Sequence, residues 1–283
     1  MGASIGRSGR VGLSSPLFTF WIVRVSIWDI LLLIMVSVMG MALAYLHHPK
    51  WKAVMLTLPI PFSLAFLSVG KPMDVTNIAG LLALLAFTHA VRVLHQDWRV
   101  PILPAIVIPA AGYCLIGTLL AGILPKTTAA FWVTFALVMG VGLALYLSQL
   151  HREEPGHRTP LPIWLKLPLM ASVVAFLVII KLLLQGFMTV FPMVGVIAAY
   201  EARKSLWTNC RAIPVIMISM GPMMASIFVT QHWLPPGAAL AIGWGVLLSI
   251  LLPLTREIWT VPTEHIPLPA ESTWKAADGV DAT

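Results

Sequence analysis

Few side chains within the apolar stretches of this chain could do chemistry. Of its 283 residues, 59% are hydrophobic and only 10% are charged. A charged side chain in the hydrocarbon of a membrane costs several kcal/mol, so each one there is a candidate functional group. Glu201 directly follows the apolar run VGVIAAY, a few residues after Pro192. We therefore predict Glu201 as a proton- or cation-coupling carboxylate; the alternative is a surface pair with Lys204.

A second group of polar side chains occurs at the end of the apolar run 75–94. His89, Arg92 and Gln96 follow one another at spacings of three and four, which places them on one face of a helix. This stripe predicts a polar pathway shared with Glu201. The alternative is a stripe that faces lipid headgroups at the membrane surface.

Further candidates for a substrate or ion pathway are isolated polar residues at other apolar runs. Lys181 interrupts the run LVIIKLLLQG, and Gln185 lies one helical turn later. Asp29, near the start of the first run, would be the carboxylate partner of Lys181. Either charge could instead reach the membrane surface through its own side chain.

The segment before residue 75 contains two more candidates, Asp74 and Asn77. Asp74 precedes a long apolar run, where an aspartate commonly caps the N-terminus of a helix. Both residues are therefore candidates to line a pathway, and the alternative for Asp74 is that it only caps this helix.

The sequence lacks the motifs of the common enzymes and pumps. It contains no HExxH and no nucleotide-binding P-loop. His47 and His48 have no carboxylate nearby that would complete a metal site, and two cysteines are too few for a disulfide scaffold. We expect no catalytic residue, no cofactor and no metal. The net charge of +7 comes from residues that flank apolar runs, so we expect no nucleic-acid partner.

The apolar runs predict an all-α, polytopic transmembrane helix bundle of about nine spans. The first membrane half, 28–150, follows a polar or interfacial segment, 1–27. A polar linker, 151–163, precedes the second half, 164–254, and a disordered tail, 255–283, follows it. The spans lie at 28–46, 53–69, 75–94, 101–124, 128–150, 164–184, 186–202, 212–230 and 238–254.

Prolines inside these runs predict broken helices and suggest an internal repeat. We expect Pro59, Pro61 and Pro192 to interrupt two spans that face each other at the centre of the bundle. Segments 99–145 and 211–254 have similar proline patterns, with Pro104 and Pro125, and Pro214 and Pro235, both 21 residues apart. Repeated, interrupted spans are typical of secondary transporters. The alternative is a likeness due to composition alone.

Lysine and arginine residues predict the orientation in the membrane. With nine spans, and without Lys275 far along the tail, 11 of them fall on one side, namely Lys50, Lys52, Arg92, Arg99, Arg152, Arg158, Lys166, Arg203, Lys204, Arg211 and Arg256. Six fall on the other, namely Arg7, Arg10, Arg24, Lys71, Lys126 and Lys181. The positive-inside rule then puts the N-terminus outside and the C-terminus in the cytoplasm, in a bacterial inner membrane.

These patterns favour an integral membrane transporter of a small solute, driven by a proton or another ion. Its partners would be the lipid bilayer and a small-molecule or ion substrate, and a homo-oligomer or a membrane-complex partner is compatible with the sequence. The alternative is a non-catalytic membrane subunit or scaffold that anchors a partner or binds lipid. A third reading is an intramembrane enzyme that acts on a lipid or quinone.

Overall fold

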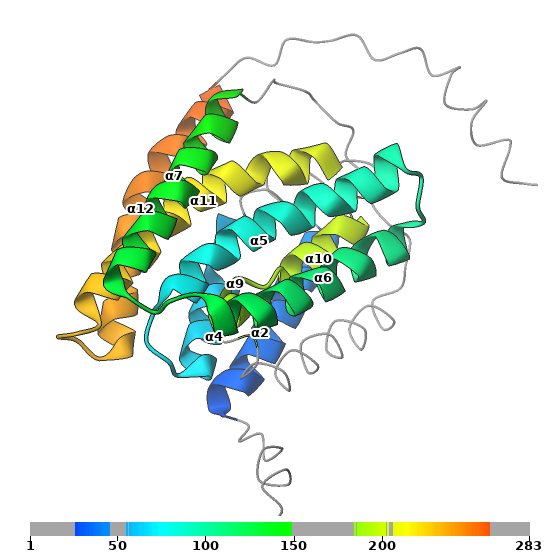
Figure 1. Ribbon diagram of the computed structural model, residues 1–283. Helices are drawn as coiled ribbons and strands as arrows, with labels where there is room; N and C mark the ends of the chain where they lie inside the picture. Colours follow the sequence, from blue (N-terminus) through cyan, green and yellow to red (C-terminus); the bar gives the residue numbers. More distant parts are fainter. Residues whose placement is uncertain are drawn as a thin grey trace, which may run out of the picture.

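The fold was obtained as a computed structural model, which describes residues 26–45, 55, 57–148, 184, 186–201, 203 and 206–260. Within these residues every regular element is a helix (Figure 1). The elements are α2 (Ile27–Tyr45), α4 (Ile60–Val69), α5 (Val75–Arg92) with its π-helical continuation η1 (Val93–Asp97), α6 (Ile102–Ile123), α7 (Thr128–Ser148), α9 (Phe187–Val190), α10 (Met193–Glu201), α11 (Leu206–Thr230) and α12 (Pro236–Thr260).

Among the residues that the structure describes, five helices are long and apolar enough to cross a membrane: α5 with η1, α6, α7, α11 and α12. Their outward faces remain apolar, and Leu147, Ile123 and Val133 are each at least 70% exposed. A soluble protein rarely leaves such continuous apolar surface in water, so lipid is the natural solvent of this bundle. The sequence-based count of nine spans is not confirmed, and the run 164–184 lies largely outside the described residues.

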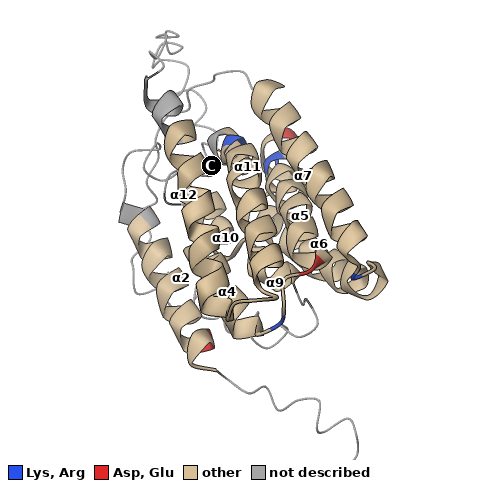
Figure 2. Ribbon diagram, turned by 90° about the vertical axis from the view of Figure 1, so that its left-hand side faces the viewer, with Lys and Arg blue, Asp and Glu red and all other residues tan. Residues whose placement is uncertain are grey.

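Within the described part of the chain, charged residues lie mainly toward the two ends of the bundle, and the helices between these ends carry almost none (Figure 2). At the first end, Lys126 lies 3.8 Å from Asp74, and Gln231 bonds to Met73. At the second end, the Arg92 guanidinium lies 4.6 Å from the ring centre of Trp207. We name these the Asp74 end and the Arg92 end.

Exposed tryptophans lie at both ends, as expected for side chains at a membrane surface. Trp98 follows η1 at the Arg92 end and is 71% exposed, while Trp233 follows α11 at the Asp74 end and is 76% exposed. Tryptophan is enriched at the headgroup level of membranes because its ring is apolar and its N–H is polar. The two residues therefore mark the two membrane surfaces.

Helix α11 is the central element of the bundle. In its apolar stretch, 72% of the residues are buried, against 17% in α7 and 28% in α6 and in α12. It packs against α5, α7 and α12, and Met217 and Met223 are fully buried in these contacts. Helices α6, α7 and α12 are therefore peripheral, with one face toward lipid.

Three helix boundaries differ from the sequence-based expectation. The span expected at 75–94 continues through η1 to Asp97, and α11 begins at Leu206 rather than 212. Helix α12 continues to Thr260, six residues into the predicted disordered tail. No proline follows Pro253 until Pro262, so the helix could extend this far. The rest of the tail, and the linker 151–163, lie outside the described residues.

The predicted repeat is not confirmed. The hairpins α6–α7 and α11–α12 both run from the Arg92 end to the Asp74 end and back. The matched broken spans run in opposite directions, because α4 leads toward the Asp74 end and α10 toward the Arg92 end. One symmetry operation cannot relate both pairs. The likeness between the hairpin sequences therefore does not establish a repeat.

Candidate functional site

Two helices are interrupted inside the bundle, each at a proline. Helical residues at 55 and 57 are followed by a break at Leu58 and Pro59, after which α4 begins with Pro61 in its first turn. Helices α9 and α10 are separated by Phe191 and Pro192. Proline favours both starts because it has no N–H to satisfy and its φ angle already suits a helix.

The two breaks border one cavity of about 110 Å³. At about 1.5 Å per residue, α4 and α10 each cover roughly half of a bilayer core. Their first residues therefore lie near the middle of the bundle. The cavity is lined by Leu58, Pro59, Pro61 and Phe62, by Leu84, Phe87, Thr88 and Val91 of α5, by 189–195 with Ala198 and Ala199, and by Leu206, Asn209, Ala212, Ile213, Ile216 and Met220 of α11.

The short helix α9 is held in place by close packing. The Tyr113 hydroxyl of α6 donates a hydrogen bond to the Phe187 carbonyl over 2.9 Å, and its ring lies edge-on to Phe191 at 5.1 Å. Gly80 of α5 permits a second close contact beside Tyr113, because a Cβ there would come within 3.0 Å of the Val190 side chain. These contacts hold α9 in the position in which residues 189–192 border the cavity.

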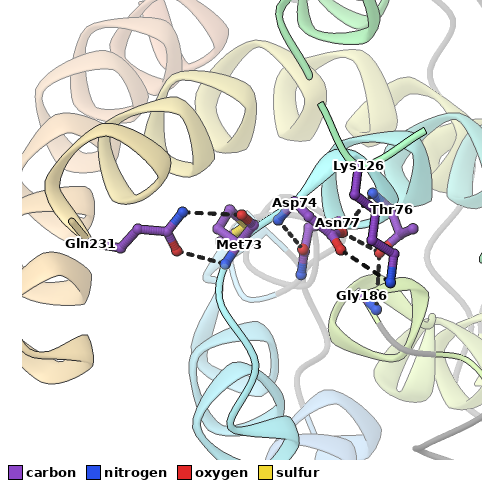
Figure 3. A network of polar contacts seen from close by, with 7 residues as sticks. All are labelled: Met73, Asp74, Thr76, Asn77, Lys126, Gly186 and Gln231. Atoms are coloured by element: carbon purple, nitrogen blue, oxygen red, sulfur yellow. Dashed lines mark hydrogen bonds and ion pairs between the residues drawn. The ribbon is translucent and has the colours of Figure 1, made fainter. Parts of the chain in front are cut away.

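A polar network ties the start of α5 to the chain before α9 (Figure 3). Asp74 caps α5: its carboxylate accepts from Thr76, and the Asn77 side chain accepts from the Asp74 N–H over 2.9 Å. Asn77 also donates to the Thr189 hydroxyl, and the Gly186 N–H donates to the Thr76 hydroxyl, both over 3.1 Å. Asp74 and Asn77 therefore hold the helices together, and neither lines the cavity.

A second feature of this end escaped the sequence reasoning. The Gln231 side chain accepts from the Met73 N–H over 2.6 Å and donates to the Met73 carbonyl over 3.1 Å (Figure 3). This pair of bonds fastens the α11–α12 turn to the segment before α5. No sequence signal predicts it, because the partner is backbone and lies 158 residues away.

The predicted polar stripe on α5 does not form a continuous pathway. His89 bonds through Nδ1 to the Leu85 carbonyl at 3.0 Å, and Arg92 is covered by Trp207. Gln96 lies in the π-helical turn η1 and is exposed. Neither His89 nor Arg92 is among the lining residues of the cavity.

The remaining sequence candidates lie apart from the cavity or outside the described residues. Asp29 is buried at the Asp74 end, where it accepts hydrogen bonds from the Ser26 N–H, over 2.7 Å, and from the Ser68 hydroxyl. Lys181 and Gln185 lie outside the described residues, so their predicted contacts stay predictions. Glu201 is the last residue of α10, three positions after the lining residue Ala198. Its side chain is outside the described part.

The cavity wall is apolar apart from the side chains of Thr88, Thr189 and Asn209. Among the described residues no ionisable side chain lines it, and no group of histidine, cysteine or acidic residues there could hold a metal ion. Sequence reasoning missed all three polar residues, because a single threonine or asparagine in an apolar helix has no distinctive pattern. The wall can enclose a small solute and hydrogen-bond it. Comparison with models of protein families, with curated proteins and with solved structures finds no match for this chain.

Proposed function

We propose that this protein is an integral membrane transporter of a small solute, which binds in the cavity between the two broken helices. The observation that carries the proposal is the meeting of both breaks, at Pro59 and at Pro192, on one cavity inside the bundle. Non-helical backbone at membrane depth is tolerated where protein or a water-filled cavity surrounds it. Secondary transporters place their binding sites between such interrupted helices.

The two half-helices provide a means of alternating access. Helix α4 lies between the cavity and the Asp74 end, and α10 lies between the cavity and the Arg92 end. Movement of one half-helix would open the cavity toward one side while the other keeps it closed. Coupling to a proton or another ion, with Glu201 as the carboxylate, is part of the proposal.

The orientation in a bacterial inner membrane also belongs to the proposal. Arg92, Arg99, Arg203 and Arg211 lie at the Arg92 end, and Lys71 and Lys126 at the Asp74 end. The positive-inside rule then makes the Arg92 end cytoplasmic.

Cysteine labelling checks this orientation. In a chain without its native cysteines, Lys126→Cys should react with an impermeant maleimide in intact spheroplasts. Asp97→Cys should react only after lysis, since both side chains are exposed but at opposite ends. The reverse pattern would show that the Arg92 end faces outward.

Water access to the cavity tests the transporter proposal without knowledge of the solute. In the same cysteine-free chain, Ala198→Cys and Ala212→Cys place a thiol on the cavity wall. Both should react with the small uncharged reagent methyl methanethiosulfonate, because a transporter must open its site to water and a hydrated thiol can ionise to the reactive thiolate.

Ala65→Cys is the matched control, since Ala65 is fully buried in α4 and does not line the cavity. It should stay unreactive. If the two cavity cysteines were as unreactive as this control, the cavity would be sealed. The transporter proposal would then be wrong, and a scaffold role would be favoured.

A further inference from the structure

Two of the three polar side chains on the cavity wall already have partners. The Thr88 hydroxyl donates to the carbonyls of Leu84 and Leu85, over 3.1 and 3.0 Å. The Thr189 hydroxyl donates to the Gly186 carbonyl over 2.6 Å and accepts from Asn77. Their hydrogen bonds hold the wall together, so neither is available as the main contact for a solute.

Asn209 differs from both threonines. It lies on α11 where the helix faces the cavity, and it is half-buried. Within the described part of the chain no hydrogen bond joins its side-chain amide to another residue. An amide offers two N–H donors and one carbonyl acceptor, and polar groups inside proteins are normally paired. The amide is therefore free to pair with a molecule in the cavity.

The cavity disfavours charged occupants. A charge without a counter-ion loses much hydration energy in an apolar site, and the described lining residues supply no counter-ion. Helices α4 and α10 also begin at the cavity, where the positive ends of their dipoles add to the cost of a cation and offset only part of the desolvation cost of an anion. A neutral molecule meets neither penalty.

The volume limits the size of the occupant. A cavity of about 150 Å³ in another protein accepts benzene. The cavity of about 110 Å³ found here is of the same order and would therefore hold a molecule of about the size of benzene.

We propose that Asn209 is the recognition residue of this cavity, and that its ligand is a small uncharged amphipathic molecule. The ligand has a compact apolar body and one polar end that both donates and accepts hydrogen bonds, as a short-chain carboxamide does. This inference rests on the proposed function, because it names the solute class of the same cavity.

Three probes of nearly equal shape test the charge preference: isobutyramide, isobutyrate and the isobutyramidinium cation. Each is titrated against the protein in lipid nanodiscs, with binding followed by ligand-observed NMR. Isobutyramide should bind, and both ions should bind at least about tenfold more weakly, because each must be desolvated without a partner. An ion that binds as tightly as the amide, or an amide that does not bind, would overturn the inference.

Variants at position 209 test the recognition residue. Asn209→Leu keeps the branched shape and the number of heavy atoms of the side chain but removes the hydrogen bonds, so the affinity for isobutyramide should fall about tenfold. Asn209→Asp supplies a carboxylate and should make the isobutyramidinium cation the preferred probe. Thr118→Val, on the exposed face of α6, is the control and should leave all three affinities unchanged.

Ala198→Leu tests whether the probes bind in the cavity, independently of the role of Asn209. It fills the cavity and should abolish binding of isobutyramide. If Ala198→Leu abolishes binding but Asn209→Leu has no effect, the cavity is the site and the role of Asn209 is refuted. The labelling of cavity cysteines tests the transporter proposal independently, because it needs no ligand.

Discussion

Replacing Gly186 by alanine is expected to destabilise the protein by about 3 kcal/mol or more, since it overpacks a fully paired polar site. A Cβ at this position would lie 2.2 Å from the Thr76 hydroxyl oxygen and 2.7 Å from the backbone nitrogen of Asn77. The hydroxyl cannot simply rotate away, because it is bonded to the Gly186 N–H and to Asp74. The backbone of Asn77 belongs to the first turn of α5. The clash with the new Cβ can therefore be removed only if α9 moves away from α5.

The measurement is the thermal unfolding midpoint of the purified protein in detergent, followed by the loss of monodisperse material. Gly140→Ala is the matched control, because a Cβ at Gly140 would meet nothing within 4 Å. It should leave the midpoint unchanged or raise it, since alanine favours helix. Equal midpoints for the two variants would show that α9 does not pack against α5 as described.

The long helices could be predicted from the sequence because they depend on local composition. Apolar runs of about twenty residues, flanked by charges, gave 101–124 and 128–150, which match α6 and α7 within two residues at each end. Lipid imposes this composition directly, because each span must form its backbone hydrogen bonds within the helix and present apolar side chains to the lipid.

The helix breaks predicted at Pro59 and at Pro192 are present, but the local sequence does not show why these prolines break a helix and others do not. The helix breaks just before α4 and before α10, yet Pro109, Pro214 and Pro222 lie inside continuous helices. A proline always removes one N–H, but the outcome depends on how neighbouring helices satisfy the freed carbonyl. That information lies in the packing and not in the local sequence.

The site was only partly accessible to sequence reasoning, which favoured charged residues. Arg92 is rare enough in an apolar run to attract attention, but Trp207 covers it. Asn209 lies in the polar stretch WTNCRA, and the expected spans 186–202 and 212–230 place it in the loop between them. Helix α11 begins at Leu206, and this earlier start carries Asn209 onto the cavity wall. The start of α11 at Leu206, and not at 212, therefore makes Asn209 a candidate contact for the solute.

Replacing Glu201 by glutamine is expected to abolish ion-coupled transport while leaving expression and stability unchanged. Glutamine keeps the size and hydrogen-bonding ability of the side chain but cannot titrate. If the solute is neutral, as the cavity suggests, the coupling charge must come from the protein. Glu201 ends the half-helix α10 that lies between the cavity and the Arg92 end. A proton bound there could control the movement of α10.

Proteoliposomes that contain the pH dye pyranine measure the coupling. Addition of isobutyramide outside should acidify the lumen with the native protein and not with Glu201→Gln. Glu257→Gln, the same substitution near the end of α12, should behave like the native protein. Lys204→Gln removes an ion pair between Glu201 and Lys204 but keeps the carboxylate, so it separates the two roles considered for Glu201. An exposed pair of this kind would contribute only a few tenths of a kcal/mol. Undiminished acidification with Glu201→Gln would assign Glu201 to that pair and leave the coupling group elsewhere in the chain.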